Sequence, residues 1–466
     1  MSRKRKSEEA SSTNDASSKL HKSETKAKPI LSIGQAATLI RRGEIDKLKE
    51  IIEEGRILNI NQSISRYSAQ TLLAVACEAD SLECVKLLVE NNAIINYEDE
   101  AQNDLLESII RGANLNILTY LLERGLITDD RCLLRCRSFI KMTGSNPMFS
   151  LLVDQITDVN FIFNHDSTFL LCTCSIGNAA LAQILLQRGA LRDWVGRHDY
   201  DALRSAAETG CTNVVTLLLN WNRTEAPIAA DRVALALSAA SYHDHLDVVR
   251  VLVEYGVGKD ALNMALYEAC EGTGGIDVVT YLLDQGADVN MRHDGMTPLV
   301  CVCSNECPDL AKLLLTRGAD PNLAAPDELR PLDAADLHYE VMTVLLEHGA
   351  DPNLPFDGDS TVLLEALRSD DMYDKAALLT VLLEHEADPN KADPDTGETP
   401  LMIAALAVEI DLVKLLLEHG ADVTQVDRDG RAVLDMLGRT RKYGQVVELC
   451  EQYIECNKPG AKAILK

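Results

Sequence analysis

The chain has 466 residues, of which 46% are hydrophobic and only 4% aromatic, and its formal net charge is −27. An acidic surface repels phosphate groups, so this charge disfavours direct binding of nucleic acid. It favours partners with basic segments, or it simply keeps the chain in solution. No apolar run is long enough to cross a membrane, so we expect no membrane insertion.

The cysteines indicate a reducing compartment. There are thirteen of them, and the first residues lack the apolar core of a signal peptide. Secretion signals and disulfide bonds usually occur together, so neither is expected here. The sequence therefore predicts a cytoplasmic and/or nuclear protein.

Residues 1–29 form a segment of different composition, rich in Ser, Lys and Glu and almost without apolar residues. Such a segment cannot bury enough apolar surface to fold, so we predict disorder. The cluster Arg3, Lys4, Arg5 and Lys6 has the composition of a nuclear import signal. The alternative is an ordinary solvated basic tail.

A leucine-rich stretch followed by Gly-Ala-Asp-x-Asn recurs along the chain, most clearly at 281–290, 313–322, 344–353 and 415–422. The residue after the leucine-rich stretch recurs about every 33 residues, a spacing typical of stacked repeats. Gly or Asn is expected there because the backbone just past a helix end often turns left-handed. The marked positions are Gly55, Asn92, Gly125, Ile156, Gly189, Asn222, Gly256, Gly286, Gly318, Gly349, Glu386, Gly420 and Tyr453. Helices that end at Ile156, Glu386 and Tyr453 should be strained or capped differently.

A second motif begins the helix upstream of each mark. Thr297-Pro298 and Thr399-Pro400 are each followed by Leu. Thr caps a helix by accepting a backbone N–H, and Pro at the first helical position has no N–H to leave unpaired. Small residues follow and allow close helix packing. Each repeat should therefore contain a helix, a short turn, a second helix, a Gly stop and an extended loop.

These residues resemble the ankyrin repeat, whose pattern is Asp-Gly-x-Thr-Pro-Leu-His-x-Ala followed by a second helix ending Leu-Leu-x-x-Gly-Ala-Asp-x-Asn. The resemblance is degenerate over 30–259 and close over 260–456, and a short basic tail follows at 457–466. The His of the pattern is replaced by Val300 and Met402. The resemblance implies an all-α solenoid of about 12–13 helix-turn-helix units with hairpin-like finger loops. It also implies a protein-interaction scaffold or adaptor without catalysis, acting as a monomeric rod.

In this family, finger tips and first helices line the binding face. The expected fingers here carry acidic residues, several of them followed by Gly as in a tight turn. We expect these residues to form an acidic row that engages a basic segment of a partner, with turn formation as the alternative role. The candidate positions are Asp294, Asp327, Asp357, Asp359, Asp395 and Asp429.

The family resemblance also suggests a modification, because the Asn of Ala-Asp-x-Asn is hydroxylated in some ankyrin repeats. Asn290, Asn322, Asn353 and Asn390 occupy that position. The alternative role, which we favour, is turn formation through an Asx hydrogen bond.

No motif predicts a catalytic site, a cofactor site or a metal site. Cys174 and Cys303 fall at the small-residue core position, so they are expected to fill space. His348, His385 and His419 recur at helix C-termini, where a positive charge suits the helix dipole. The Gly-rich segment 271–275 lacks the Lys and Ser or Thr of a phosphate loop and is expected to join two helices.

An alternative function is substrate recognition for a ubiquitin ligase complex. Some ankyrin arrays are followed by a box that begins Leu-Cys-x-x-x-Ile, and Leu449, Cys450 and Ile454 fit that fragment. The same residues also fit the second helix of the last repeat, and few residues follow them.

Overall fold

The computed structural model contains helices and loops over the residues that it describes. Four isolated β-bridges are formed in this part of the chain. None of the helices in the part of the chain that the structure describes is both long and apolar enough to span a bilayer. The described residues are 29–57, 59–64, 70–96, 100–126, 128–144, 146, 148–162, 167–197, 200–221, 227–273, 275–324, 329–356, 360–369, 375–438 and 441–457.

The chain divides into two compact units. The first comprises the chain up to Phe139 together with 150–155, and the second comprises 140–149 and everything from Ile156 onward. The division passes through two short helices, α8 (Arg137–Ile140) and α9 (Phe149–Val153). The other helices of the first unit are α1 (Ile33–Arg41), α2 (Ile45–Glu53), α3 (Leu72–Glu78), α4 (Leu82–Glu90), α5 (Glu100–Gly112), α6 (Leu115–Glu123) and α7 (Asp130–Arg135).

The second unit begins its regular helix pairs with α10 and continues to α27. The first helices of its repeats are α10 (Phe169–Ile176), α12 (Ala202–Glu208), α14 (Ala230–Tyr242), α16 (Lys259–Glu271), α18 (Pro298–Ser304), α20 (Pro331–Ala334), α22 (Val362–Arg368), α24 (Pro400–Ala407) and α26 (Val433–Leu437). The second helices are α11 (Ala179–Gln187), α13 (Thr212–Asn220), α15 (Leu246–Gly256), α17 (Ile276–Asp284), α19 (Pro308–Thr316), α21 (Tyr339–Glu347), α23 (Lys375–Glu384), α25 (Ile410–Glu418) and α27 (Gly444–Asn457).

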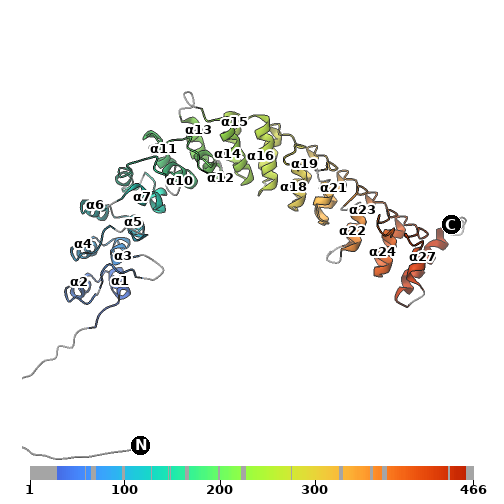
Figure 1. The fold of residues 1–466 in the computed structure, drawn as a ribbon, viewed down its shortest axis with the longest axis horizontal. Helices are drawn as coiled ribbons and strands as arrows, with labels where there is room; N and C mark the ends of the chain where they lie inside the picture. Colours follow the sequence, from blue (N-terminus) through green and yellow to red (C-terminus); the bar gives the residue numbers. More distant parts are fainter. Residues whose placement is uncertain are drawn as a thin grey trace, which may run out of the picture. The chain divides into compact units, whose positions relative to one another are not determined.

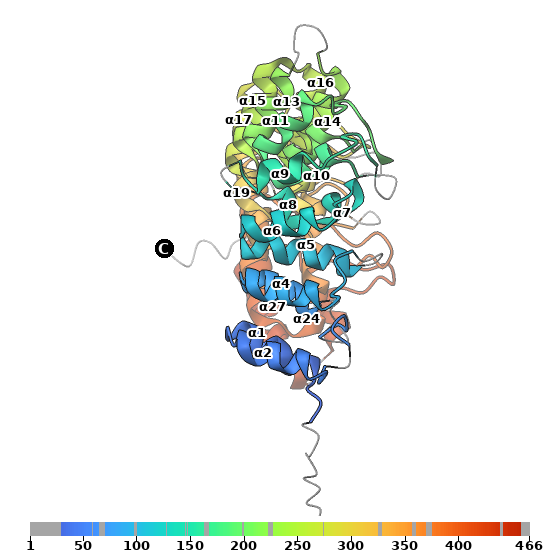
Figure 2. The same cartoon turned by 90° about the vertical axis from the view of Figure 1, so that its left-hand side faces the viewer.

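Within the second unit the helices form two layers, with first helices packed on first helices and second helices on second helices (Figure 1). The described loops that join one repeat of this unit to the next project from the same end of the helix pairs (Figure 2). Small buried residues, including Ala206, Ala236, Ala240 and Ala265, let the first helices approach closely. The predicted all-α solenoid of helix-turn-helix repeats is confirmed.

Capping explains where the first helices begin. Thr297 and Thr399 each accept the backbone N–H three residues on, and Pro298 and Pro400 follow them as the first helical residue. Thr71, Thr168 and Thr361 cap their helices in the same way without a proline. Removing such a cap typically costs about 1 kcal/mol. The predicted starts of α18 and α24 are therefore confirmed.

Left-handed backbone ends most of the second helices, as predicted. Positive φ occurs at the marked positions Gly55, Asn92, Gly125, Gly189, Gly256, Gly286, Gly318, Gly349, Glu386 and Gly420. Glu386 has φ 68°, a conformation that costs a residue with a side chain about 1–2 kcal/mol, so this helix end is strained as expected. Tyr453 differs, because α27 continues through it. Asn222 lies outside the described residues.

The repeat pattern of helix pair and extended loop does not hold at α14 and α16. Each of these helices has thirteen residues, whereas α12 and α18 have seven each. Only Val257 and Gly258 separate α15 from α16, so the extended loop expected between them is replaced by additional helix. Ala and Leu dominate α14, and they favour helix over the turn that Asp-Gly forms elsewhere.

Candidate functional site

Finger loops join several repeats of the second unit and contain the predicted acidic positions Asp294, Asp395 and Asp429. Four of them close on isolated bridges, between Val195 and Asp201, His293 and Met296, Phe356 and Ser360, and Val426 and Ala432. A fifth closes on a hydrogen bond from the Asp393 N–H to the Glu398 carbonyl (2.8 Å). We call these segments, 195–201, 293–296, 356–360, 393–398 and 426–432, the finger loops.

Asp294 occupies the tight turn that its sequence predicts. Its φ is 48° and that of Gly295 is 86°, the two left-handed residues of a primed hairpin turn. The Asp294 side chain is 91% exposed, and the His293 Nε2 lies 3.8 Å from its carboxylate. The predicted positions Asp327, Asp357 and Asp359 lie outside the described residues.

Asp395 and Asp429 do not themselves form the turns in which they lie. Those turns depend on two buried carboxylates that the sequence reasoning missed, Asp393 and Asp427. Asp393 accepts the N–H groups of Asp395 and Thr396, and Asp427 accepts those of Asp429 and Arg431. The spacing could have identified them, since an Asp side chain commonly accepts the N–H two residues on.

Basic residues interrupt the acidic row. Arg431 pairs with Asp427 (2.7 Å) and with Asp429 (2.8 Å). Arg368 pairs with Asp393 (2.6 Å). Burial raises the pKa of Asp393, but hydrogen bonds from the Thr396 N–H and the Arg368 guanidinium lower it more. The pKa of Asp393 is therefore held at about 2. Asp294 and Asp395 are therefore the described members of the predicted row that present an exposed carboxylate without an Arg or Lys partner in this part of the structure.

The Asn residues of Ala-Asp-x-Asn join adjacent repeats. The amide group of Asn322 donates to the Gly349 carbonyl (3.1 Å), and its oxygen accepts the Asp351 N–H (2.9 Å). Asn290, Asn353 and Asn390 make the same pair of bonds to the next repeat. We call these residues the Asn clamps.

The turn role that we favoured for these Asn residues belongs instead to the preceding Asp. Asp320 accepts the Asn322 N–H (2.9 Å), and Asp288, Asp351 and Asp388 do the same in their repeats. The Asn side chain is thereby left to bond the neighbouring repeat. Sequence spacing could not reveal this, because the partner lies about one repeat further along the chain.

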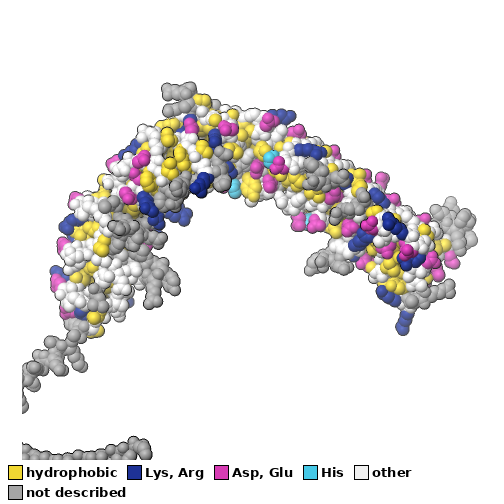
Figure 3. Space-filling view, viewed as in Figure 1, with side chains coloured by type: hydrophobic (Ala, Val, Ile, Leu, Met, Phe, Trp, Pro, Cys, Tyr) yellow, Lys and Arg dark blue, Asp and Glu magenta, His cyan; other side chains and the backbone are white. Residues whose placement is uncertain are grey.

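A groove of about 490 Å³ opens on the first helices α12, α14 and α16, where the finger between α15 and α16 is missing. Acidic, histidine and hydrophobic side chains lie beside one another over this part of the second unit (Figure 3). Leu235 and Met264 contribute apolar surface, Tyr242 an exposed ring, and Glu208 and Glu268 carboxylates. The sequence features described above do not predict this groove.

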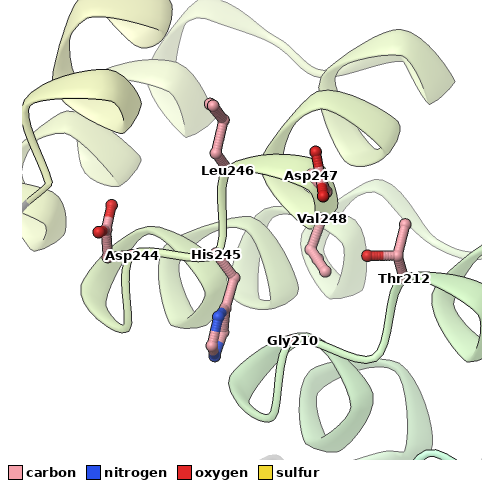
Figure 4. Close-up of a pocket in the computed structure, with 7 residues that line it drawn as sticks. All are labelled: Gly210, Thr212, Asp244, His245, Leu246, Asp247 and Val248. Carbon is pink, nitrogen blue, oxygen red and sulfur yellow. The ribbon is translucent and has the colours of Figure 1, made fainter.

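His245 has a structural position. Its Nε2 lies 3.0 Å from the Glu208 carbonyl of the preceding repeat. Its ring points toward the turn at Gly210, where a Cβ atom would come within 2.7 Å of the ring (Figure 4). The cavity of about 330 Å³ beside it is lined largely by backbone turns and by Thr212, Asp244 and Asp247. The ring therefore joins two repeats.

The cysteines expected to fill space do so. Cys174 and Cys303 are fully buried, and burial raises the pKa of both thiols, which keeps them protonated. Over the described residues no three His, Cys, Asp or Glu side chains are grouped to hold a metal ion.

The remaining sequence features also lie in repeat structure. His348 and His419 directly follow the last residues of α21 and α25. The Gly-rich segment joins α16 to α17, and its Thr273 N–H donates to the Tyr242 carbonyl (3.0 Å). Cys450 is buried within α27, which packs on α25, so the Leu-Cys fragment belongs to the last repeat.

Comparison with known proteins gives several relatives that share parts of this chain. The "Ankyrin repeat and KH domain-containing protein mask-1" of Caenorhabditis elegans is 27% identical over 379 residues, 77% of this chain and 14% of its own length. "Ankyrin repeat and SOCS box protein 5" of Mus musculus is 32% identical over 120 residues, 25% of this chain and 35% of its own. "Protein phosphatase 1 regulatory subunit 27" of Homo sapiens is 36% identical over 84 residues, 18% and 54% respectively.

The chain covers only small parts of the first of these relatives and of the "E3 ubiquitin-protein ligase hecd-1" of Caenorhabditis elegans. The latter is 36% identical over 91 residues, 18% of this chain and 3% of its own length. Among solved structures, the human ASB11 ankyrin repeat domain is 26% identical with a TM-score of 0.40, over 44% of this chain and 93% of that one.

The family described as "Ankyrin repeats (3 copies)" matches five overlapping or separate stretches, 35–131, 224–293, 266–356, 332–427 and 363–459. Together these stretches cover more than half of the chain and include both units. They contain the Thr-capped helices α18 and α24 and the Asn clamps described above. The chain is a member of the ankyrin-repeat family.

Proposed function

We propose that this chain is a protein-interaction scaffold or adaptor with no catalysis of its own, which binds partner proteins through its finger loops and first helices. Ankyrin repeats are general protein-interaction modules, and repeat stacks provide long surfaces for that purpose. The observation that carries the proposal is the series of finger loops with exposed carboxylates, Asp294 and Asp395 among them. A partner with a basic segment would complement these charges.

The test reverses the charge of exposed finger residues. We expect Asp294→Lys combined with Asp395→Lys to weaken partner capture in affinity purification from the native cell, without loss of helical circular dichroism. Asp309→Lys, on the exposed N-terminal turn of α19, is the matched control. The acidic row predicted from the sequence would be tested further by reversal at Asp327 and Asp357. Unchanged capture by all these variants would contradict binding through the acidic row.

Substrate recognition for a ubiquitin ligase complex is the second candidate. It is favoured by the similarity to a protein described as containing a SOCS box and to one described as an E3 ubiquitin-protein ligase. Purification under mild conditions would recover a cullin or another ligase subunit if this function holds. Recovery of partners without any ligase component would leave the adaptor function alone.

Two further expectations belong to this proposal. The cluster Arg3, Lys4, Arg5 and Lys6 lies outside the described residues, and we propose that it directs nuclear import. Replacing all four by Ala should move a fluorescently tagged chain from nucleus to cytoplasm.

We also propose that the scaffold acts as a monomer without direct binding of nucleic acid. Light scattering of the purified chain and an RNA and DNA shift assay test these points.

Hydroxylation of Asn290, Asn322, Asn353 and Asn390 remains a proposal. In the folded stack both amide atoms of each residue are bonded to the next repeat. A modifying enzyme would therefore need the repeat to open locally, which the strained end at Glu386 favours for Asn353. Peptide mass analysis of protein from its native cell should show added oxygen on Asn353 before the others. The absence of any added oxygen would remove the proposal.

A further inference from the structure

The groove on α12, α14 and α16 differs from the rest of the second unit because no finger loop lies between α15 and α16. At the finger loops defined above, a partner would meet the tips of the fingers. Here it would meet the sides of two thirteen-residue helices directly. The groove also contains a finger side chain from one flank, since His293 of the loop 293–296 lines it.

The floor and one wall of the groove are preformed. Leu235 and Met264 are half-buried on facing helices and present apolar surface to the groove. His293 packs edge-on against the Tyr267 ring at 4.9 Å between centroids, and its backbone N–H and carbonyl are both bonded to Met296. Rigid side chains reduce the entropy lost when a ligand binds.

Most charges at one end of the groove are already engaged. Glu208 accepts a hydrogen bond from the Tyr200 hydroxyl (2.8 Å), and the His243 Nε2 lies 3.7 Å from its carboxylate. Arg204 lies over the Tyr200 ring, 5.8 Å from the centroid. This end therefore has little unsatisfied charge to offer.

Glu268 is the exception. Its side chain is half-buried in the groove, and no residue that the structure describes gives its carboxylate a hydrogen bond or an ion pair. Burial first, and the neighbouring Glu271 second, raise the pKa of Glu268 against the opposing effects of His293 and Arg204. A carboxylate kept in this state gains more from an added cation than a solvated one does.

Tyr242 supplies a second attraction for a cation. The Tyr242 side chain is 38% exposed and lines the same groove. The face of a tyrosine ring attracts Lys and Arg, and the planar guanidinium of Arg also stacks on it. Apolar floor, aromatic ring and unpaired carboxylate together match one side-chain type, a long aliphatic stem that ends in a positive charge.

We propose that this groove binds an Arg or Lys side chain, flanked by an apolar residue, in a segment of a partner protein. The cation pairs with Glu268 beside Tyr242, and the apolar neighbour packs on Leu235 and Met264. This inference rests on the proposed scaffold function and names the groove and the partner chemistry. It is separate from the finger row, because neither Asp294 nor Asp395 lines the groove.

The experiment uses the full chain and a phage-displayed library of random twelve-residue peptides. We expect selection on the wild type to enrich peptides with Arg or Lys next to Leu, Ile, Met or Phe. Synthetic copies should bind Glu268→Gln at least about tenfold more weakly, the change that a lost 1.4 kcal/mol interaction produces. Glu254→Gln, an exposed position on α15 outside the groove, should bind them as the wild type does.

A second variant tests whether the apolar floor of the groove also contributes to peptide binding. Leu235→Asn removes apolar floor without altering charge, and it should also weaken binding while helical circular dichroism is retained. Equal binding by wild type and Glu268→Gln, or enrichment of peptides without Arg or Lys, would overturn the proposal. Displacement of the selected peptides by a synthetic peptide of residues 1–28 would also overturn it, since the occupant would then be the chain's own basic segment.

Failure of this proposal can be told apart from failure of the scaffold function. If the selected peptides fail while the Asp294→Lys and Asp395→Lys variant loses its partner, the groove inference falls and the scaffold function stands. If neither the groove variants nor the finger variant changes any binding, both fall.

Discussion

Two parts of the second unit hold neighbouring repeats together by different means. From α17 to α25, each Asn clamp bonds the backbone of the next repeat, and finger loops extend beyond the helices. Between α15 and α16 the finger is absent, and the longer helices α14 and α16 pack through buried small residues such as Ala240 and Ala265. Packing between α14 and α16 therefore takes the place of the Asn clamp that joins the repeats from α17 to α25.

The exchange has a consequence for binding. A finger loop places an exposed turn before the first helix of its repeat, as Asp294 does before α18. Without it, the first helices present an open groove whose lining comes mostly from helical side chains. The same repeat architecture therefore offers two chemically different surfaces, exposed carboxylates on turns and a partly apolar groove with one unpaired carboxylate.

The largest effect on stability is expected where the long helices α14 and α16 pack together. Ala265 is fully buried in α16, so Ala265→Leu would force α14 and α16 apart. We expect the free energy of unfolding to fall by about 1–3 kcal/mol, measured by urea denaturation. Ala261→Leu, half-buried on the same helix, should change it by less than about 0.5 kcal/mol. Similar values for both would mean that tight packing does not hold these repeats together.

A smaller effect is expected from the Asn clamps. Asn322→Ala removes two hydrogen bonds to the next repeat and should lower the free energy of unfolding by about 1–2 kcal/mol. It should also speed hydrogen exchange at the Asp351 amide.

Asn263→Ala is the matched comparison at the helical repeat. Asn263 accepts one bond, from the Asp288 N–H (2.8 Å), so its loss should cost about half as much. Equal costs at Asn322 and Asn263 would remove the distinction between the two parts of the unit.

Short-range features of the fold could be predicted from the sequence. Thr297 caps its helix, Gly286 and Gly318 end theirs, and Asp294 turns with Gly295, because each depends on residues within a few positions. The inter-repeat features could not. Asn322 bonds residues about one repeat away, and the turn role expected for it belongs to Asp320.

The groove was missed for a related reason. The marks at Gly256 and Gly286 keep their spacing, so the periodicity gave no sign that the intervening loop is helical. The composition did contain a signal. Between Gly256 and the start of the next second helix there is no Asp-Gly turn or Thr-Pro start, and Leu262, Ala265, Leu266 and Ala269 follow helical spacing.

The smallest predicted effect lies at the groove itself. Because burial and Glu271 raise the pKa of Glu268 in the fold, its charged form is less stable there than in the unfolded chain. Glu268→Gln should therefore raise the free energy of unfolding near neutral pH, by less than about 1 kcal/mol for a partly exposed group.

The pH dependence of the free energy of unfolding shows whether the Glu268 carboxylate stabilises or destabilises the fold. The penalty is present above the folded pKa of Glu268, and it disappears as the pH falls below the unfolded value and both states become protonated. Urea denaturation of wild type and Glu268→Gln should thus give different free energies of unfolding at neutral pH and similar ones in acid. If Glu268→Gln raises stability and also weakens peptide binding, the carboxylate serves recognition at a cost in stability. If the substitution lowers stability instead, Glu268 has a structural partner in the folded chain, and the unpaired charge on which the groove inference depends does not exist.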